Sequence, residues 1–491
     1  MTLTGTHPTV NGHTAVDEQL VGGVRVRRDG DRLVWVPDVF ELTATELRAL
    51  ARTIAGRVSA RLSDLVHSAG ALVGDAEKVR AATETRRALT VVDEDRVTGG
   101  LRPLTPECGE AVFVGVMDRL FALADLSPWW RNEQVENIDV NGHRQAIVTF
   151  AGGVKVWIGP IADNPDDLID IVRTAARRLG LTEQGFDART PYIDVHLPDG
   201  SRLAATFGGD RQSGVGVDCY VNIRRHRYAT LSSDDLVNLG LLPDRANRFL
   251  RAWVRAGGNL IVAGDFNAGK TTALRAWAAD IQPWHRVVTV ESGITELGLH
   301  DQHGDRTRVN VVALYSRGPN SEGEGEVTVA DLITRPVRRL NATRVIAGEI
   351  NNGDEVIPIL DCMTASTRGS MFTIHARSAR GVVDRLESYG LMASPAKDPR
   401  LVRSMVIEAA PLIVHLTADE TIDGRIVRYV TGIVEVVGRD RDGTHETVLM
   451  TDLWHLDHHN QLQPVARPST LACENLARHG WVWATDGWSP A

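Results

Sequence analysis

The stretch VAGDFNAGKTT, Val262 to Thr272, combines residue types and spacings that could bind phosphate. Gly264, Gly269, Lys270 and Thr271 occupy every fixed position of the pattern G-x-x-x-x-G-K-[ST]. An apolar run of strand type, NLIVAG, precedes the loop, and TALRAWAAD follows with helical character. A glycine-containing loop between a strand and a helix can aim successive N–H groups at one anion, aided by the helix N-terminus. This context favours a phosphate loop over a chance turn.

Lysine is scarce in this chain, which makes the one in the loop informative. Lysine and arginine together number 54, and Lys78, Lys155, Lys270 and Lys397 are the lysines. We expect Lys270 to face the β and γ phosphates as a point charge, a slot that a planar guanidinium fits badly. Thr271 is predicted to supply a hydroxyl to Mg²⁺. The predicted cradle for the nucleotide comprises Gly264, Asn267, Ala268, Gly269, Lys270, Thr271 and Thr272.

Three later strand-like segments each end in a side chain that could act on bound phosphate or water. RVVTVES ends with Glu291, RVIAGEI with Glu349, and GSMFTIHA with His375. Carboxylates at the ends of neighbouring parallel strands can hold the Mg²⁺ shell or polarise an attacking water. We therefore predict catalytic roles for Glu291, Glu349 and His375, and Mg²⁺ binding through Thr271 and Glu349.

The elements that position these residues suggest several segments. Residues 1–38 are predicted to be a mobile arm with one strand, and 39–109 a helical segment that begins near Thr43 or Thr45. Residues 110–235 are predicted to form an α+β domain with a largely antiparallel sheet, in which Asn141-Gly142 is the turn of a hairpin. Residues 236–437 show the strand–helix alternation of a parallel α/β domain. Residues 438–491 are predicted to be a tail with a polar loop, one strand and a tryptophan-containing end.

Composition and charge narrow the class of protein. The net charge of −9 at pH 7 argues against a general nucleic-acid binder, so no direct nucleic-acid contact is expected. Four cysteines without C-x-x-C spacing predict reduced thiols rather than a zinc site. The first residues lack the features of a secretory signal, and no apolar run approaches the roughly 20 residues that span a bilayer. We expect a cytoplasmic protein that reaches the membrane through a partner.

Beyond the phosphate loop, further motifs stand in a characteristic order. They are ENIDVNG, LPDGSRLAA, NIRRHR, LSSDDLVNLGLL, GEGEVTVADLITR, RVIAGEI and GSMFTIHARSARGVVDRLESY. From about Glu110 to about Leu416, the chain resembles the traffic ATPases of type II and type IV secretion and pilus assembly, most closely the Tad pilus branch.

The resemblance implies a RecA-like ATPase domain preceded by a sensor-like α+β domain, a homo-hexamer, and ATP with Mg²⁺ in the cleft between the domains. It also implies an inner-membrane platform protein as partner. Glu291 matches the family's acidic box, Glu349 its Walker B glutamate and His375 its histidine box. Arg202, Arg224 and Arg225 match arginines that reach the phosphates from the N-terminal domain.

Several positions depart from the family pattern. Ser292 stands where the acidic box has aspartate, and Asn351-Asn352 replaces an arginine after the Walker B glutamate. His196 lies where an arginine is usual before LPDGSR, and Arg368 where an aspartate precedes the histidine box. The departures around Glu291 and Glu349 keep one alternative open, a nucleotide-binding structural subunit that hydrolyses ATP weakly. A second alternative, a conjugative DNA-transfer ATPase, shares the fold that the resemblance implies.

Three remaining stretches each allow a functional role and an ordinary structural one. His455 to His459 could bind a metal, but a solvated tail is the preferred interpretation. Trp481 and Trp483 alternate as on a strand, which favours packing over a partner surface. Glu322 to Glu326 is predicted to be an acidic loop, followed by a helix that Thr328 and Asp331 cap.

Overall fold

The computed structural model places the chain in two compact units, residues 1–227 and 228–491. It describes residues 18–69, 74–179, 185–208, 215–225, 231–292, 297–299, 310–318, 324–421, 426–442, 445–484 and 487–490. The expected boundary between residues 235 and 236 falls inside helix α6 (Ser233–Asn238), so it has to precede that helix. A capping box of Ser232 and Asp235 starts α6 as part of the second unit.

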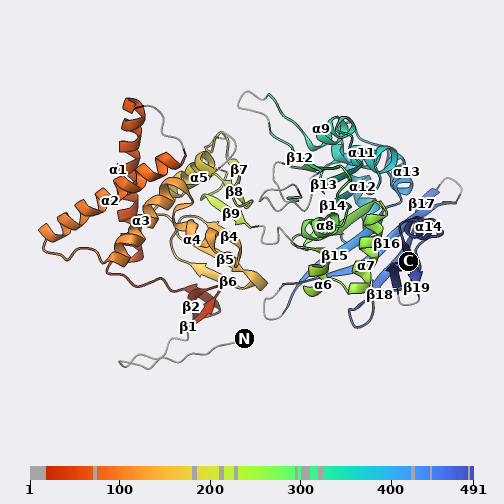
Figure 1. The fold of residues 1–491 in the computed structure, drawn as a ribbon, viewed down its shortest axis with the longest axis horizontal. Coiled ribbons are helices and arrows are strands. Elements are labelled where there is room, and N and C mark those ends of the chain that lie inside the picture. The colour runs from red at the N-terminus through yellow and green to blue at the C-terminus, as the bar shows by residue number, and fades with distance from the viewer. Residues whose placement is uncertain are drawn as a thin grey trace. The chain divides into compact units, whose positions relative to one another are not determined.

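The first unit is built on one nine-stranded sheet with the order β1-β2-β3-β6-β5-β4-β9-β8-β7 (Figure 1). Every neighbouring pair is antiparallel except β3 and β6, which are parallel. The strands are β1 (Glu18–Val21), β2 (Val24–Asp29), β3 (Arg32–Trp35), β4 (Val135–Asn141), β5 (Ala146–Phe150), β6 (Lys155–Ile158), β7 (Tyr192–His196), β8 (Arg202–Thr206) and β9 (Tyr220–Arg224).

Residues 18–35 differ from the mobile arm with one strand that was expected. They form three strands, and β3 joins the sheet by pairing with β6. Val26 is fully buried and Trp35 packs edge-on against Trp129, 5.3 Å between ring centroids. These two apolar contacts give the short polar segment a fixed place. Residues 1–17 of the predicted arm lie outside the described residues.

Hydrophobic alternation explains how the sheet is covered. Ile193, Val195, Leu203 and Ile223 point to one face and are buried together with helix α5 (Pro165–Leu179). Their neighbours on the same strands are partly or fully exposed and point to the opposite face. The predicted Asn141-Gly142 hairpin is present between β4 and β5, with Gly142 at φ 75°.

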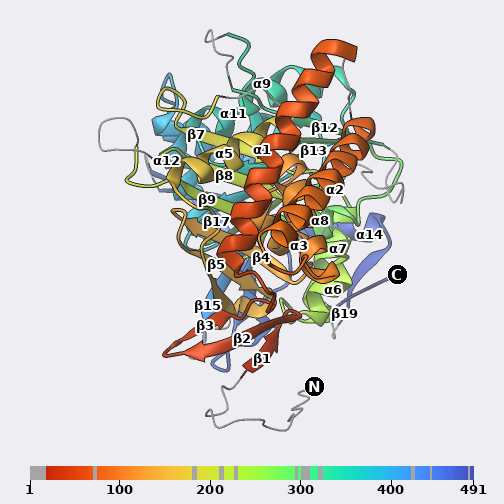
Figure 2. The same cartoon turned by 90° about the vertical axis from the view of Figure 1, so that its left-hand side faces the viewer.

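Three helices, α1 (Ala44–Ala69), α2 (Asp75–Thr98) and α3 (Pro106–Phe121), pack against one another in the same unit (Figure 2). Thr43 starts α1 by a reciprocal pair of hydrogen bonds with Glu46, as predicted. A short 3-10 helix (Ala124–Leu126) and α4 (Ser127–Arg131) follow α3. Helix α2 lies inside the segment predicted to be helical, but its bounds could not be predicted, because only Ala81, Glu84 and Thr85 of this helix are buried and an apolar stripe is therefore lacking.

The second unit has a nine-stranded sheet with the order β12-β11-β13-β14-β10-β15-β16-β17-β18. The first six strands are parallel and the last three are antiparallel. The strands are β10 (Leu260–Gly264), β11 (Val287–Glu291), β12 (Val311–Tyr315), β13 (Arg344–Ile350), β14 (Met371–His375), β15 (Leu412–Glu420), β16 (Ile426–Asp442), β17 (His445–Leu456) and β18 (Leu462–Pro464). This arrangement is the RecA-like P-loop ATPase fold that was predicted.

Both faces of this parallel sheet are buried, so its strands are almost continuously apolar. Leu260 and Val262 contribute to the core on one face, and Ile261 and Ala263 to the core on the other. The helices of this unit are α6, α7 (Asp244–Arg255), α8 (Lys270–Ala278), α9 (Val329–Thr334), α10 (Pro336–Arg339), α11 (Gly353–Asp361), α12 (Gly381–Met392), α13 (Pro399–Ala409) and α14 (Thr470–Arg478), with a π-helical turn at Cys362–Ser366. The predicted capping pair, Thr328 and Asp331, starts α9.

The C-terminal segment is part of the second unit, which corrects the prediction of a separate tail. β16 and β17 extend through most of the stretch expected to be a polar loop, and they pair in register from Gly432–His455 to Asp442–His445. Buried Glu435 on β16 accepts hydrogen bonds from the backbone N–H and hydroxyl of Ser469, at 2.8 and 2.5 Å. Ser469 in turn caps α14, so a buried carboxylate fixes the last helix to the sheet.

Trp481 lies on the predicted strand, now β19 (Trp481–Ala484), which pairs with β20 (Gly487–Pro490).

In the described part of the chain, no helix is both long and apolar enough to cross a membrane.

Candidate nucleotide-binding site

The phosphate loop follows β10 and leads into α8, as predicted. Gly264 ends β10 with φ 153°, and a side chain there would overlap the carbonyl oxygen of Leu416 on β15. Asn267 and Gly269 have φ values of 58° and 86°, in the left-handed region. Only glycine and a few residues such as asparagine adopt that region at low cost. The loop therefore turns back on itself directly before the helix N-terminus, the geometry that an anion-binding loop requires.

Lys270 is turned into this loop rather than into solvent. Its side chain is 7% exposed, and Nζ donates to the Asp265 carbonyl oxygen at 2.9 Å. Nζ also lies 3.1 Å from Nδ1 of His375. A buried ammonium group held over the helix N-terminus can attract phosphate oxygens with little screening by water.

His375 connects Lys270 to Glu349. Its Nε2 lies 2.9 Å from Oε1 of Glu349, while Nδ1 faces Lys270. Burial, and then the charge of Lys270, lower the pKa of His375 below its ordinary value. A neutral imidazole with its proton on Nε2 satisfies both neighbours, since Nε2–H donates to the carboxylate and Nδ1 accepts from the ammonium. The strand order explains why His375 contacts both Glu349 and Lys270, because β14 lies between β13 and β10.

Glu291, the third predicted group, has different surroundings. It is 3% exposed, and its Oε1 accepts a hydrogen bond from the backbone N–H of Leu297 at 2.8 Å. A Cβ at Gly348 would be 3.2 Å from its Cγ, so the side chain packs against β13 one residue before Glu349. The structure thus places Glu349, His375 and Lys270 in one contact chain and gives Glu291 a backbone partner beside it.

The predicted arginines belong to the first unit, where they do not share one face. Arg202 and Arg224 are directly paired across β8 and β9, so their side chains leave the sheet on the same side. Arg202 bonds Asp194 through Nε and Nη2 at 3.1 and 3.0 Å. Arg225 is held within its own unit, with Nη1 donating to the Asn132 carbonyl at 2.5 Å and Nε 3.5 Å from Asp199. The alternation of strand side chains separates Arg225 from the other two.

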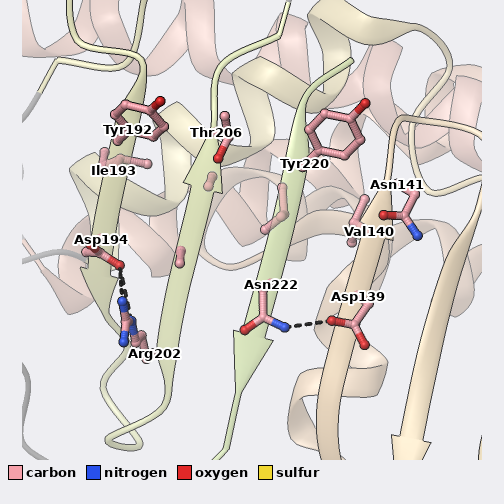
Figure 3. Close-up of a pocket in the computed structure, with 13 residues that line it drawn as sticks. Asp139, Val140, Asn141, Tyr192, Ile193, Asp194, Arg202, Thr206, Tyr220 and Asn222 are labelled. Carbon is pink, nitrogen blue, oxygen red and sulfur yellow. Dashed lines mark hydrogen bonds and ion pairs between the residues drawn. The ribbon is translucent and has the colours of Figure 1, made fainter. Parts of the chain in front are cut away.

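The open sheet face beside Arg202 carries a shallow pocket of about 320 Å³ (Figure 3). Tyr192 and Tyr220 stand on either side of Thr206, and Asn222 donates to Asp139 at 2.7 Å farther along the strands. This face is polar and accessible within its unit, in contrast to the packed opposite face.

Comparison with known proteins decides the family. Residues 168–428 match the family described as "Type II/IV secretion system protein". The chain belongs to this family. A Mycobacterium tuberculosis relative whose name assigns it to conjugal transfer is 28% identical over 293 residues, which are 58% of this chain and 76% of the relative. The type IV secretion system protein PtlH of Bordetella pertussis is 30% identical over 209 residues, 43% of this chain and 53% of that protein. The crystal structure of the VirB11 ATPase of Brucella suis is similar with a TM-score of 0.32 and 20% identity, over 63% of this chain and 92% of that one.

One of the departures from the family pattern, Asn351-Asn352, has a structural role here. Oδ1 of Asn352 accepts from the backbone N–H groups of Asp354 and Glu355, which caps α11. The buried Glu355 carboxylate in turn accepts hydrogen bonds from Asn351 N at 3.0 Å and from Asn352 Nδ2 at 2.6 Å. Burial raises the pKa of Glu355. The pattern N-x-x-E before an apolar run is a capping signal and could have revealed this helix start.

Three residues near the loop were not predicted from the sequence to belong to the site. The Phe266 ring lies 4.1 Å from the His375 ring, centroid to centroid. Buried His415 pairs in register with Ala263 and bonds Thr431 and the Ala376 carbonyl. Arg428 donates to the Asn267 carbonyl from β16. Phe266 occupies a variable motif position, and the other two belong to distant strands, so spacing gave no signal for any of them.

Proposed function

We propose that the chain is an ATP-hydrolysing traffic ATPase that powers pilus assembly or type II/IV secretion. The observation that carries this proposal is the contact chain from Lys270 through His375 to Glu349 at the mouth of the phosphate loop. A cation, a neutral imidazole and a carboxylate lie within hydrogen-bond distance of their neighbours there. This set suits binding of a polyphosphate followed by activation of water.

Each residue has a distinct proposed role. Lys270 faces the β and γ phosphates, and the backbone from Gly264 to Gly269 cradles them. The Thr271 hydroxyl, on the first turn of α8, and the Glu349 carboxylate provide the oxygen donors that Mg²⁺ prefers. A Mg²⁺ ion held by these oxygens would neutralise phosphate charge. Glu349 or Glu291 then polarises the attacking water, and His375 holds the Glu349 carboxylate in place.

The coupling of chemistry to work is also a proposal. Arg202 and Arg224 point from one open sheet face and could reach the γ-phosphate when the two units close over ATP. We propose that the protein acts as a cytoplasmic homo-hexamer of the Tad pilus branch and transmits this motion to an inner-membrane platform protein. The arginine face that Arg202 and Arg224 share supports the closure step, and the family membership supports a role in secretion or pilus assembly.

The deciding experiment is steady-state ATP turnover of the full chain, compared with Lys270→Ala and Lys155→Ala. Lys155 is an exposed lysine on β6 and serves as the matched control. We expect Lys270→Ala to abolish turnover and weaken ATP binding, while Lys155→Ala behaves as wild type. Unchanged ATP affinity of Lys270→Ala in a calorimetric titration would disprove the phosphate-loop assignment.

A second candidate is a nucleotide-binding structural subunit that hydrolyses ATP weakly. The capping role of Asn352, in the segment where the family has an arginine, favours this possibility because that cation is absent from the loop after Glu349. Tight Mg-ATP binding by the wild type with trace turnover would support it.

A third candidate is a DNA-transfer motor, which the name of the mycobacterial relative suggests. Turnover stimulated severalfold by DNA would favour this function over pilus assembly.

A further inference from the structure

The phosphate loop contains a residue in the left-handed region that is not glycine. Between Gly264 and Gly269 the four residues are Asp265, Phe266, Asn267 and Ala268, none of them glycine. Asn267 nevertheless adopts φ 58°, the left-handed region. Asparagine adopts that region more readily than most residues but less readily than glycine, so a contact that holds Asn267 there favours the folded loop over other conformations of the same segment.

Arg428 contacts the loop at this position. Its Nε donates to the Asn267 carbonyl oxygen at 2.7 Å, and its Cδ lies 3.5 Å from where a Cβ would stand on Gly269. The side chain therefore spans the last turn of the loop, from one left-handed residue to the next.

The sheet register places Arg428 there. Leu416 of β15 pairs with Gly264, and Arg428 of β16 pairs with Ala418, two residues farther along β15. Arg428 therefore lies just beyond the carboxyl end of β10. Val430, two residues later on the same face of β16, is buried in the core that includes α8 residues. Arg428 is thus directed to the side of the sheet where the loop leads into α8.

We propose that Arg428 is a positioning residue that holds Asn267 in its left-handed conformation, so that the phosphate loop is formed before nucleotide binds. The proposal rests on the nucleotide-binding function proposed above. A hydrogen bond from a charged donor to a carbonyl is stronger than one between neutral groups. By fixing the Asn267 carbonyl away from the cradle, it leaves the N–H groups of the loop free to face the β-phosphate. Both ADP and ATP carry that phosphate, so both need the loop.

The test measures affinity for Mg-ADP and for a non-hydrolysable Mg-ATP analogue by calorimetry, in wild type, Arg428→Ala, Asn267→Gly and the double variant. Arg428→Ala should weaken both nucleotides about tenfold, the size expected when one charged hydrogen bond is lost. Glycine adopts φ 58° without a side-chain penalty, so in the Asn267→Gly background the same substitution should cost less than about threefold. Arg439→Ala, on an exposed position of β16, is the matched control and should bind as wild type.

The outcomes separate this proposal from its alternatives. An equal loss in both backgrounds, or a loss confined to the ATP analogue, would mean that Arg428 acts directly on phosphate and would overturn the positioning role. Full affinity of Arg428→Ala would also overturn it, while leaving the proposed function intact. Failure of the wild type to bind either nucleotide would instead refute the proposed function. Thermal unfolding midpoints within about 3 °C of wild type, roughly the shift from 1 kcal/mol in a domain of this size, would confirm that the variants are folded.

Discussion

Replacement of Gly264 by alanine tests how closely the phosphate loop is fitted to the sheet. The added methyl group would overlap the carbonyl oxygen of Leu416 and lie 3.1 Å from its carbonyl carbon. Both strands are fully buried at this point, with Ala263 and Leu416 inaccessible to solvent, so neither can move freely. Overpacking of a closed interior costs about 1–3 kcal/mol. The φ of 153° adds strain, because side chains rarely adopt such angles, at about 1–3 kcal/mol.

Gly438 on β16 provides a control with a similar φ and no steric conflict. Its φ is 158°, and nothing lies within 4 Å of the place where its Cβ would be. Gly438→Ala should therefore show the backbone strain alone, and Gly264→Ala the strain together with the overlap.

The assay is urea unfolding of both variants, followed by calorimetric titration with Mg-ATP. We expect Gly264→Ala to lose about 1–3 kcal/mol more unfolding free energy than Gly438→Ala, from the overlap term alone. It should also bind ATP more weakly, because relief of the overlap displaces the start of the loop. Equal destabilisation by the two substitutions, with normal ATP binding, would refute the conclusion that Leu416 fixes the loop.

Three further predictions concern charge. Glu349→Gln should retain ATP binding but lose turnover at least about a hundredfold, since a carboxylate that acts on Mg²⁺ or water is removed while the cradle stays; steady-state kinetics with a binding control decide this. Arg202→Ala and Arg224→Ala should weaken ATP but leave ADP nearly unchanged, as measured by paired titrations, and an equal loss of both nucleotides would contradict a γ-phosphate role. Burial lowers the pKa of both His375 and His415. The unfolded chain therefore binds more protons below its ordinary histidine pKa of 6.5, and stability should fall as the pH drops through that value; a smaller slope in His415→Gln than in wild type, by urea unfolding at several pH values, would confirm the direction.

The strand, the loop and the helix around Lys270 could be predicted because all three are contiguous in the sequence. A strand, a loop with fixed glycines and a helix lie within about 20 residues, and local rules suffice to recognise them. The same holds for the hairpin at Asn141-Gly142 and the cap of α9 by Thr328. Local patterns did not predict the bounds of α2, because this helix has almost no apolar stripe. At one of its few buried positions stands the charged residue Glu84, which pairs with Arg61.

Long-range pairing accounts for the other differences. The contact of Arg428 with Asn267 depends on β16 lying two strands from β10, which no spacing along the chain reveals. The segment after residue 437 looked like a tail because its polar residues are frequent, yet backbone pairing of β16 with β17 holds it to the sheet. Arg225 matched a family arginine by position, but an offset of one residue turns it from the face that Arg202 and Arg224 share.

Strand order also determines which side chains of the site contact one another. Glu349, His375 and Lys270 come from segments that are 26 and 105 residues apart, and a sequence shows only that each follows a strand end. Because β14 lies between β13 and β10, the imidazole of His375 is the group that can contact both other side chains at once. Its neutral form donates on one side and accepts on the other, so protonation would remove the acceptor that faces Lys270. The lowered pKa of His375 favours the neutral form, in which the imidazole can accept from the ammonium group and donate to the carboxylate.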